Sequence, residues 1–174
     1  VRHFGSAMIT DSDLLNNGGD GIEAQGNASV DGSNISNNGD DGINSFTVQN
    51  LEVTDSELLN NANDGIFADG DSVSVDESNI SNNGDDGIEA LAQTLEVTDS
   101  DLLNNQINVV VSSGNASVTD STLEASSNDG VRVSSGSLSV SGSEILDSGN
   151  NAVDVSSNNV NVSVSDSEIN NTNL

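Results

Sequence analysis

The chain has 174 residues, enough for one domain or one repeat array, and its 29 acidic residues against two basic ones give a formal net charge of −27. Such a surface repels nucleic acids and anionic lipids, and it favours cations, a high-salt medium or a basic partner. The absence of cysteine excludes disulfides and thiolate metal sites, and no apolar run reaches the roughly 18 residues of a membrane span. We therefore expect no nucleic-acid partner and no membrane insertion.

Eight copies of one repeat fill the chain. Each copy has a β-branched residue, a serine three positions later, and a Leu or Ile two positions after that. An Asn pair and a turn ending in Asp-Gly usually follow, as in the eleven residues that 33–43 and 78–88 share. A fixed period of this length is typical of solenoid proteins. The β-branched residues recur every 21 to 24 positions, at Ile9, Val30, Val53, Val75, Val97, Val118, Val140 and Val164.

Within a copy, apolar and polar residues alternate as they do in a β-strand. Residues 51–54 and 73–76 both follow an inward, outward, inward, outward pattern. Asn, Gly and Asp separate these short runs, and Asn and Gly tolerate the left-handed backbone of tight corners. Because no 3.6-residue periodicity is present, each copy of about 22 residues is predicted to form three short strands and three corners, without an α-helix.

The apolar columns predict a folded chain. High charge with low hydrophobicity usually indicates disorder, but Val, Leu and Ile hold fixed columns through all eight copies. Stacked coils bury these columns together, and Asn and Ser are expected to form ladders at the corners. The prediction is an all-β parallel solenoid over residues 1–174, one continuous array without obvious caps. Val53, Leu58, Ile66 and Ala68 should point inward, as should Ala24, Ala90, Val133 and Val155, while Thr54, Asp55 and Glu57 should point outward.

The turn Asn-Asn-Gly-Asp-Asp-Gly-Ile and the preceding Val-x-x-Ser-x-Ile resemble the generic coil of right-handed parallel β-helix proteins of pectin-lyase-like architecture. The resemblance covers the whole chain, and the eight copies of the repeat predict a right-handed parallel β-helix of about eight coils. That family holds pectin and pectate lyases, polygalacturonases, phage tailspikes, adhesins and surface proteins. The resemblance therefore implies a coil and an extracellular or cell-surface location, but it does not specify an activity.

Catalysis of the kind found in that family is not expected here. Its lyases use a Lys or Arg base and usually bound calcium, whereas this chain has only Arg2 and Arg132, which lie six coils apart in the alignment. Its hydrolases use clustered Asp, but here the pairs Asp40-Asp41 and Asp85-Asp86 repeat with the coil and are predicted to be solvated corners. Trp and Tyr, the usual sugar-stacking platforms, are absent. We predict a non-enzymatic protein with no catalytic residue and no required cofactor.

Two outward acidic columns predict diffuse association with Ca²⁺ or other cations, because stacked carboxylates repel one another. A specific calcium site is left open: residues 18–21 resemble the glycine-rich calcium nonapeptide, but its period is missing. The single histidine, His3, is expected to pack or make an end contact rather than to bind a metal. The columns are Asp11, Asp55, Glu77, Asp99, Asp120 and Asp166, and Asp13, Glu57, Asp101, Glu144 and Glu168.

The two ends of the array are nearly in phase. Val1 falls in the column of Ile22 and Leu174 in that of Ile107, so only two turn residues would separate one copy from the next. The resulting hypothesis is a structural protein that stacks head-to-tail into a filament or forms a surface stalk, with itself and cations as partners. A piece of a longer surface protein and a glycan-binding or glycan-degrading module are the alternatives. The expected end-to-end interface is Val1, Arg2, His3, Phe4, Asn171, Asn173 and Leu174.

Overall fold

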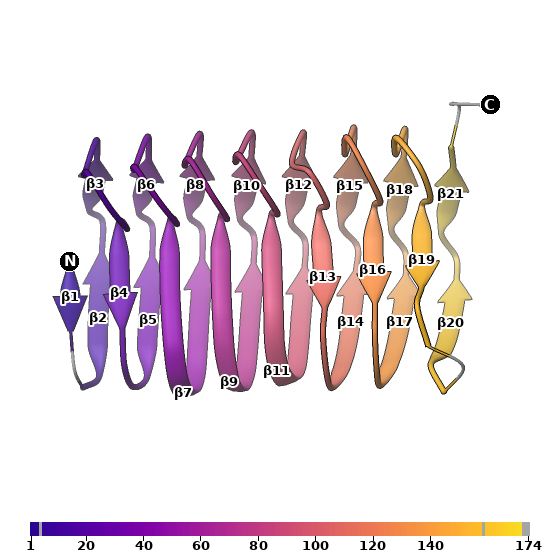
Figure 1. The fold of residues 1–174 in the computed structure, drawn as a ribbon, viewed down its shortest axis with the longest axis horizontal. Helices are drawn as coiled ribbons and strands as arrows, with labels where there is room; N and C mark the ends of the chain where they lie inside the picture. The colour runs from indigo at the N-terminus through magenta and orange to yellow at the C-terminus, as the bar shows by residue number, and fades with distance from the viewer. Residues whose placement is uncertain (4, 158, 172–174) are drawn as a thin grey trace.

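The computed structural model describes residues 1–3, 5–157 and 159–171. The chain winds as a parallel solenoid in which each strand pairs with the equivalent strand of the next turn (Figure 1). Two neighbouring turns, for example, pair Ile66 with Ile88 and Val75 with Val97. This confirms the predicted all-β solenoid, and no helix occurs among the described residues.

Three strand ladders run along the solenoid. Ladder 1 contains β1 (Arg2–His3), β4 (Ile22–Ala24), β7 (Ile43–Thr54), β9 (Ile66–Asp76), β11 (Ile88–Thr98), β13 (Val109–Val111), β16 (Val131–Val133) and β19 (Val153–Val155). Ladder 2 contains β2 (Ala7–Thr10), β5 (Ala28–Asp31), β14 (Asn115–Thr119), β17 (Ser137–Ser141) and β20 (Asn161–Ser165), together with the second halves of β7, β9 and β11. Ladder 3 contains β3 (Asp13–Leu15), β6 (Asn34–Ser36), β8 (Glu57–Leu59), β10 (Asn79–Ser81), β12 (Asp101–Leu103), β15 (Thr122–Glu124), β18 (Glu144–Leu146) and β21 (Glu168–Asn170).

The predicted eight copies correspond to the eight strands of ladder 3. Seven full turns separate the first of these strands from the last, so the solenoid makes about seven turns. In the middle turns, β7, β9 and β11 pass from ladder 1 to ladder 2 as single bent strands (Figure 1). The corner between ladders 2 and 3 is tighter. The residue that follows the ladder 2 strand has a left-handed backbone there; Asp55, for example, has φ 48°.

The core is the set of inward columns that the repeat predicts. Val53, Leu58, Ile66 and Ala68 are completely buried, whereas Asp55 and Glu57 are exposed and Thr54 is half-buried. Burying one aliphatic side chain contributes about 1.5–3 kcal/mol, and each column repeats this contribution turn after turn. The predicted register is therefore confirmed through the middle of the rod.

The last turn departs from that register in one respect. Val155 continues the column of Ala24 and Ala68 in sequence, but it is 39% exposed. Val162, Val164 and Ile169 of the same turn are also exposed. These side chains share columns with buried residues of earlier turns, and within the described structure no further turn covers them.

Serine and asparagine ladders line two corners, as predicted. The Ser33 amide donates to the Ser56 hydroxyl at 3.1 Å, and the Ser56 amide donates to the Ser78 hydroxyl at the same distance. The asparagine ladder runs through Asn17, Asn38, Asn61, Asn83 and Asn105, in which the Asn38 side-chain amide donates to Asn61 Oδ1 at 2.9 Å. These bonds satisfy polar groups that would otherwise be buried without a partner.

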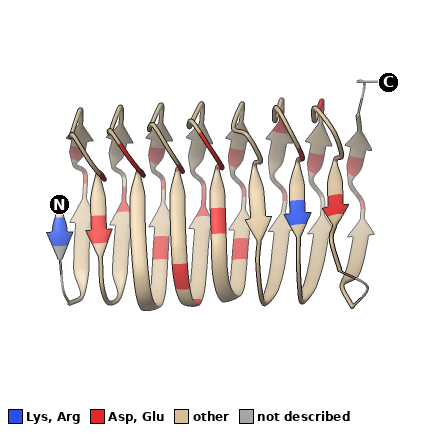
Figure 2. Ribbon diagram, viewed as in Figure 1, with Lys and Arg blue, Asp and Glu red and all other residues tan. Residues whose placement is uncertain are grey.

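The charged residues are spread along the whole rod (Figure 2). Acidic residues occur on every turn, while Arg2 and Arg132 lie near opposite ends. Within the described residues, no helix has the length and apolarity that crossing a membrane requires.

Candidate functional site

Five aspartates form a column at the corner that leads into ladder 1. Each is followed by Gly and then by the Ile or Val that opens a ladder 1 strand. Ile107 and Asn151 take the equivalent place in two other turns. We call this column the aspartate ladder: Asp20, Asp41, Asp64, Asp86 and Asp129.

Each carboxylate of the ladder accepts a backbone hydrogen bond from the next turn. The Asp64 amide donates to Asp41 Oδ1 at 3.1 Å, and the Asp86 amide donates to Asp64 Oδ1 at 2.8 Å. Asp41 and Asp64 are only 4% and 3% exposed. The expectation of solvated corners is therefore wrong for Asp41, because its carboxylate is needed inside the corner as an acceptor, whereas Asp40 beside it is exposed.

The glycine after each aspartate is required by close packing between turns. A Cβ on Gly42 would lie 2.6 Å from the carbonyl oxygen of Gly65 and 2.8 Å from Asn61 Nδ2. No side chain fits at this position, so the backbones of successive turns pack directly against each other. This contact holds each aspartate within hydrogen-bonding reach of its neighbour.

Burial, followed by repulsion from neighbouring carboxylates, raises the pKa of four ladder residues, Asp20, Asp41, Asp64 and Asp86. Burial is the main cause for Asp64, whose pKa is raised to about 7, and the nearby charges of Asp41 and Asp86 act in the same direction. The pKa of Asp86 is also raised to about 7, by burial first and then by Asp85. The ladder thus holds carboxyl groups that change protonation state near neutral pH, in contrast to ordinary surface acids.

Two clusters of three carboxylates lie along this corner. One comprises Asp20, Asp40 and Asp41, and the other comprises Asp64, Asp85 and Asp86, with oxygen atoms within 4.8 Å of one another in each. Oxygen donors at this spacing suit a hard divalent cation such as Ca²⁺. These residues are where the structure could hold a metal, and they differ from the outward columns that the sequence suggested.

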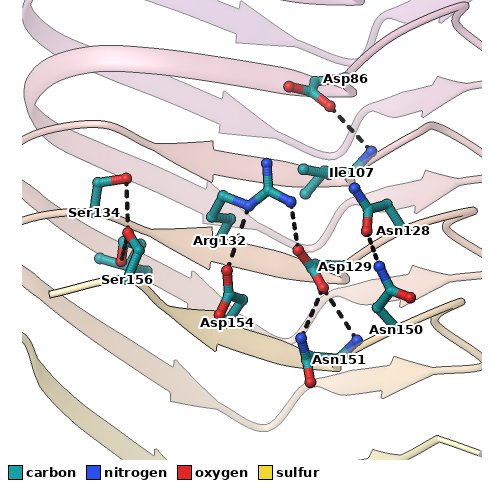
Figure 3. Close-up of polar contacts among 11 residues, drawn as sticks. Asp86, Ile107, Asn128, Asp129, Arg132, Ser134, Asn150, Asn151, Asp154 and Ser156 are labelled. Carbon is teal, nitrogen blue, oxygen red and sulfur yellow. Dashed lines mark hydrogen bonds and ion pairs between the residues drawn. The ribbon is translucent and has the colours of Figure 1, made fainter.

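Arg132 marks the far end of the aspartate ladder (Figure 3). Its Nη2 atom lies 2.6 Å from Asp129 Oδ2, and its Nε atom lies 3.5 Å from Asp154 Oδ2. Asp129 Oδ1 accepts two further hydrogen bonds, from the backbone and side-chain amides of Asn151, both at 3.1 Å. The arginine thus compensates a buried carboxylate, a role that its isolated place in the sequence did not indicate.

The residues of the predicted end-to-end interface fall at opposite ends of the rod. Val1 is 59% exposed, and Arg2 forms an ion pair with Glu23 at 3.1 Å. Asn171 Nδ2 donates to the Asn150 carbonyl at 2.5 Å. The backbone of His3 pairs with Ala24, while the His3 side chain, Phe4, Asn173 and Leu174 lie outside the described residues. A single chain does not bring the two sets together.

A comparison with protein-family models matches residues 1–137 to the right-handed β-helix region. The chain belongs to the right-handed β-helix family. The match covers most of the chain and agrees with its parallel turns of about 22 residues. Neither a curated protein nor a solved structure matches the chain. The β-helix assignment supports the pectin-lyase-like architecture, whereas function depends on the side chains that this particular β-helix carries.

One feature of the β-helix surface does not repeat from turn to turn. Phe46 and Phe67 lie with ring centroids 5.7 Å apart, at a tilt of 55°. They border a shallow hollow of about 350 Å³ that also touches both carboxylate clusters. The repeat pattern does not predict this pair, because the two phenylalanines occupy different positions in their copies. The hollow is lined by Asp40, Asp41, Asn44, Phe46, Asn63, Asp64, Phe67, Asp85 and Glu89.

The raised pKa values predict that the β-helix is more stable in mild acid than in mild alkali. A carboxyl whose folded pKa of about 7 exceeds its unfolded value of 3.8 contributes stability that is fully present below 3.8 and lost as pH rises through about 7. The melting temperature should therefore fall between about pH 5 and about pH 8.

The variant Asp64→Asn tests the source of that pH dependence. Its amide oxygen can still accept from the Asp86 amide, as a neutral group. It should be more stable than wild type at about pH 8, by a clearly larger margin than at about pH 5, and show a flatter pH profile. Asp101→Asn, at an exposed position of β12, is the control and should leave the profile unchanged. Parallel profiles for Asp64→Asn and wild type would contradict the assignment.

Cations should stabilise the same rod. With 29 acids on a thin solenoid, the melting temperature should rise with sodium chloride and more steeply with calcium chloride, which places two charges near each cluster. Asp85→Asn should reduce the calcium increment, whereas Asp101→Asn should leave most of it. Thermal scans across a salt series provide the measurement, and a flat or falling response would refute the expectation.

Proposed function

We propose that this protein is a structural, non-enzymatic β-helix of the cell surface or extracellular space, which stacks head-to-tail with copies of itself into a filament or stalk. The observation that carries the proposal is the exposed last turn. Val155, Val164 and Ile169 stand in columns that are buried elsewhere, and the strand edge of β19–β21 has no neighbour in the described chain. Edges of this kind accept another strand, and copies added in one direction continue without closing.

The register of a second copy follows from the strand ladders. The strand β1 occupies the place in ladder 1 that would follow β19, which sets Val1 of the added copy on Val153 and Arg2 on Asp154. Arg2 already pairs with Glu23 in its own chain, and Asp154 pairs with Arg132. The junction would therefore continue an alternation of opposite charges within a strongly acidic rod, which favours this polarity over a head-to-head contact.

The experiment uses the 174-residue chain and two single-face variants. Wild type should form fibres visible by electron microscopy, with an axial repeat of roughly 38 Å, the height of eight coils at about 4.8 Å each. Val164→Asp blocks the last turn, and Val1→Asp blocks the first. Each variant alone should sediment as a monomer, because only one face remains usable.

Mixing the variants distinguishes the polarity of stacking. A head-to-tail contact predicts a 1:1 heterodimer, since the free first turn of one variant meets the free last turn of the other. Head-to-head stacking would instead give a homodimer of at least one variant alone. A wild-type chain that stays monomeric at high concentration, with circular dichroism of an intact β-sheet, would overturn self-assembly and leave a covalently continued stalk as the structural role.

A glycan-binding β-helix is the second candidate, and the Phe46–Phe67 hollow favours it. Aromatic rings beside carboxylate and amide groups are the elements with which proteins stack on and hydrogen-bond to sugars. Calorimetric titration with neutral oligosaccharides tests it. Binding that is abolished by Phe67→Ala and retained in Val164→Asp would support this role, and no heat with any oligosaccharide would reject it.

A further inference from the structure

The hollow beside Phe46 and Phe67 lies in the middle of the rod. It spans the first residues of β7, β9 and β11, and each of these strands pairs with a described turn on both sides. The surface of the hollow therefore does not depend on what lies beyond either end of the chain. It is also separate from the first and last turns, so a role for it goes beyond self-assembly.

Carboxylates form most of the polar wall of the hollow. Asp40 is exposed and Asp85 and Glu89 are half-buried, so these three acids can reach a ligand. Asp41 and Asp64 lie deeper, where each already accepts a backbone hydrogen bond from the next turn. Burial, and then the nearby charge of Asp85, raises the pKa of Glu89. The wall is thus a set of acceptors that repel one another.

The chain does not compensate this charge itself. It has two Lys or Arg residues, and neither lines the hollow. Arg2 forms an ion pair with Glu23, while Arg132 pairs with Asp129 and Asp154 (Figure 3). A second copy carries the same committed arginines. A cation that neutralises the hollow therefore comes from a different molecule.

The aromatic rings select the kind of cation. Phe67 lies between Asn44 and Glu89 on successive turns of ladder 1, where neighbouring side chains point the same way about 4.8 Å apart. A cation resting on the Phe67 ring thus has the Glu89 carboxylate within reach. A hydrated metal ion gains little from a ring, whereas a guanidinium is weakly hydrated and stacks on aromatic faces. Its five N–H donors and lack of an acceptor match a wall of carboxylates.

We propose that this hollow is a docking site for an arginine side chain carried by a basic segment of another protein. Its volume of about 350 Å³ is at the lower end for small-molecule sites, and its shallow shape suits a side chain presented from outside. The net charge of −27 attracts such a segment to the rod. A neutral sugar would stack on the same rings but leave the carboxylates uncompensated, so the charge favours arginine over a glycan.

Titration followed by nuclear magnetic resonance, with two capped pentapeptides as probes, tests the proposal. One peptide has a central arginine, the other a central lysine, and both have glycine elsewhere. The full chain carrying Val164→Asp is used, so that stacking does not enter the result. The arginine peptide should shift the signals of residues 44–46, 63–67 and 85–89. It should bind at least about threefold more tightly than the lysine peptide, because an ammonium group lacks the planar fork that stacks and bridges carboxylates.

Three further substitutions separate the hollow from the general acidity of the rod. Phe67→Leu keeps an apolar side chain and every charge, and should weaken the arginine peptide by about threefold or more. Glu89→Gln keeps the shape of the side chain and should weaken both peptides. The matched control is Glu96→Gln, at an exposed position of the same strand in ladder 2. At about 0.15 M salt it should leave both affinities within about twofold.

Three outcomes would overturn the proposal. Equal affinity for the two peptides, with shifts spread over all turns, would show only diffuse attraction to an acidic rod. Equal losses in Glu89→Gln and Glu96→Gln would lead to the same conclusion. Shifts at the hollow caused by a neutral oligosaccharide, and not by the arginine peptide, would assign the site to a sugar.

Discussion

Ile80→Asp should abolish folding of the β-helix. Ile80 is completely buried in ladder 3 between Leu58 and Leu102, and no positive group is available to pair with a carboxylate there. Burying an unpaired charge and losing an aliphatic core contact place the cost at more than about 4 kcal/mol, which is exceptional for a single substitution. Circular dichroism and thermal unfolding should show loss of the cooperative transition.

The matched control introduces the same side chain on an outward column. Thr119 is half-buried, lies between Thr98 and Ser141, and shares its column with the natural aspartates Asp31 and Asp76. Thr119→Asp should therefore change stability by less than about 1 kcal/mol. If Ile80→Asp melted like wild type, the inward and outward columns would have been assigned the wrong way round.

The fold could be predicted from the sequence because all eight copies of the repeat support the same register. A single Val-x-Val run does not determine a fold. Eight copies in register do, because only a stacked solenoid buries every apolar column at once. Val53, Leu58 and Ile66 follow that logic and are buried. The exceptions occur in the last turn, where Val155 keeps the pattern but has no neighbouring turn to bury it.

The aspartate ladder was harder to predict, because periodicity locates a turn without saying which of its side chains point inward. The informative signal lies in the comparison between copies. Aspartate recurs at positions 20, 41, 64, 86 and 129, whereas the position before it varies among Gly19, Asp40, Asn63, Asp85 and Asn128. A residue that repeats beside a variable one has a role inside the corner, namely as acceptor for the backbone amide of the next turn.

The aromatic hollow lay beyond any repeat-based argument. Phe46 and Phe67 do not share a column, since Phe67 pairs with Asn44 and Phe46 pairs with Asp69. An irregularity follows in β7 between Phe46 and Val48, where Thr47 adopts φ 54°. Among the described strand pairs, a register shift of this kind occurs only between β7 and β9. Residues that depart from the repeat give a solenoid its local, non-repeating sites. An alignment of the copies emphasises what they share, so it does not reveal such residues.

Asn61→Ala should strongly destabilise the rod. Asn61 Oδ1 accepts from the backbone and side-chain amides of Asn38 at 3.1 and 2.9 Å, and its Nδ2 donates to the Ile35 carbonyl at 3.1 Å. Alanine leaves these groups buried without partners, at about 1–3 kcal/mol each, so the total loss should be on the order of 4 kcal/mol.

The same column provides the control for this prediction. Ser126 continues the ladder after Asn105, is buried, and has a hydroxyl with no hydrogen-bond partner among the described residues. Ser126→Ala should therefore be neutral within about 0.5 kcal/mol, or slightly stabilising. Denaturant titration of the two variants gives the difference directly. Equal losses for Asn61→Ala and Ser126→Ala would mean that the column stabilises the rod through packing alone. A loss confined to Asn61→Ala would mean that its inter-turn hydrogen bonds hold successive coils together.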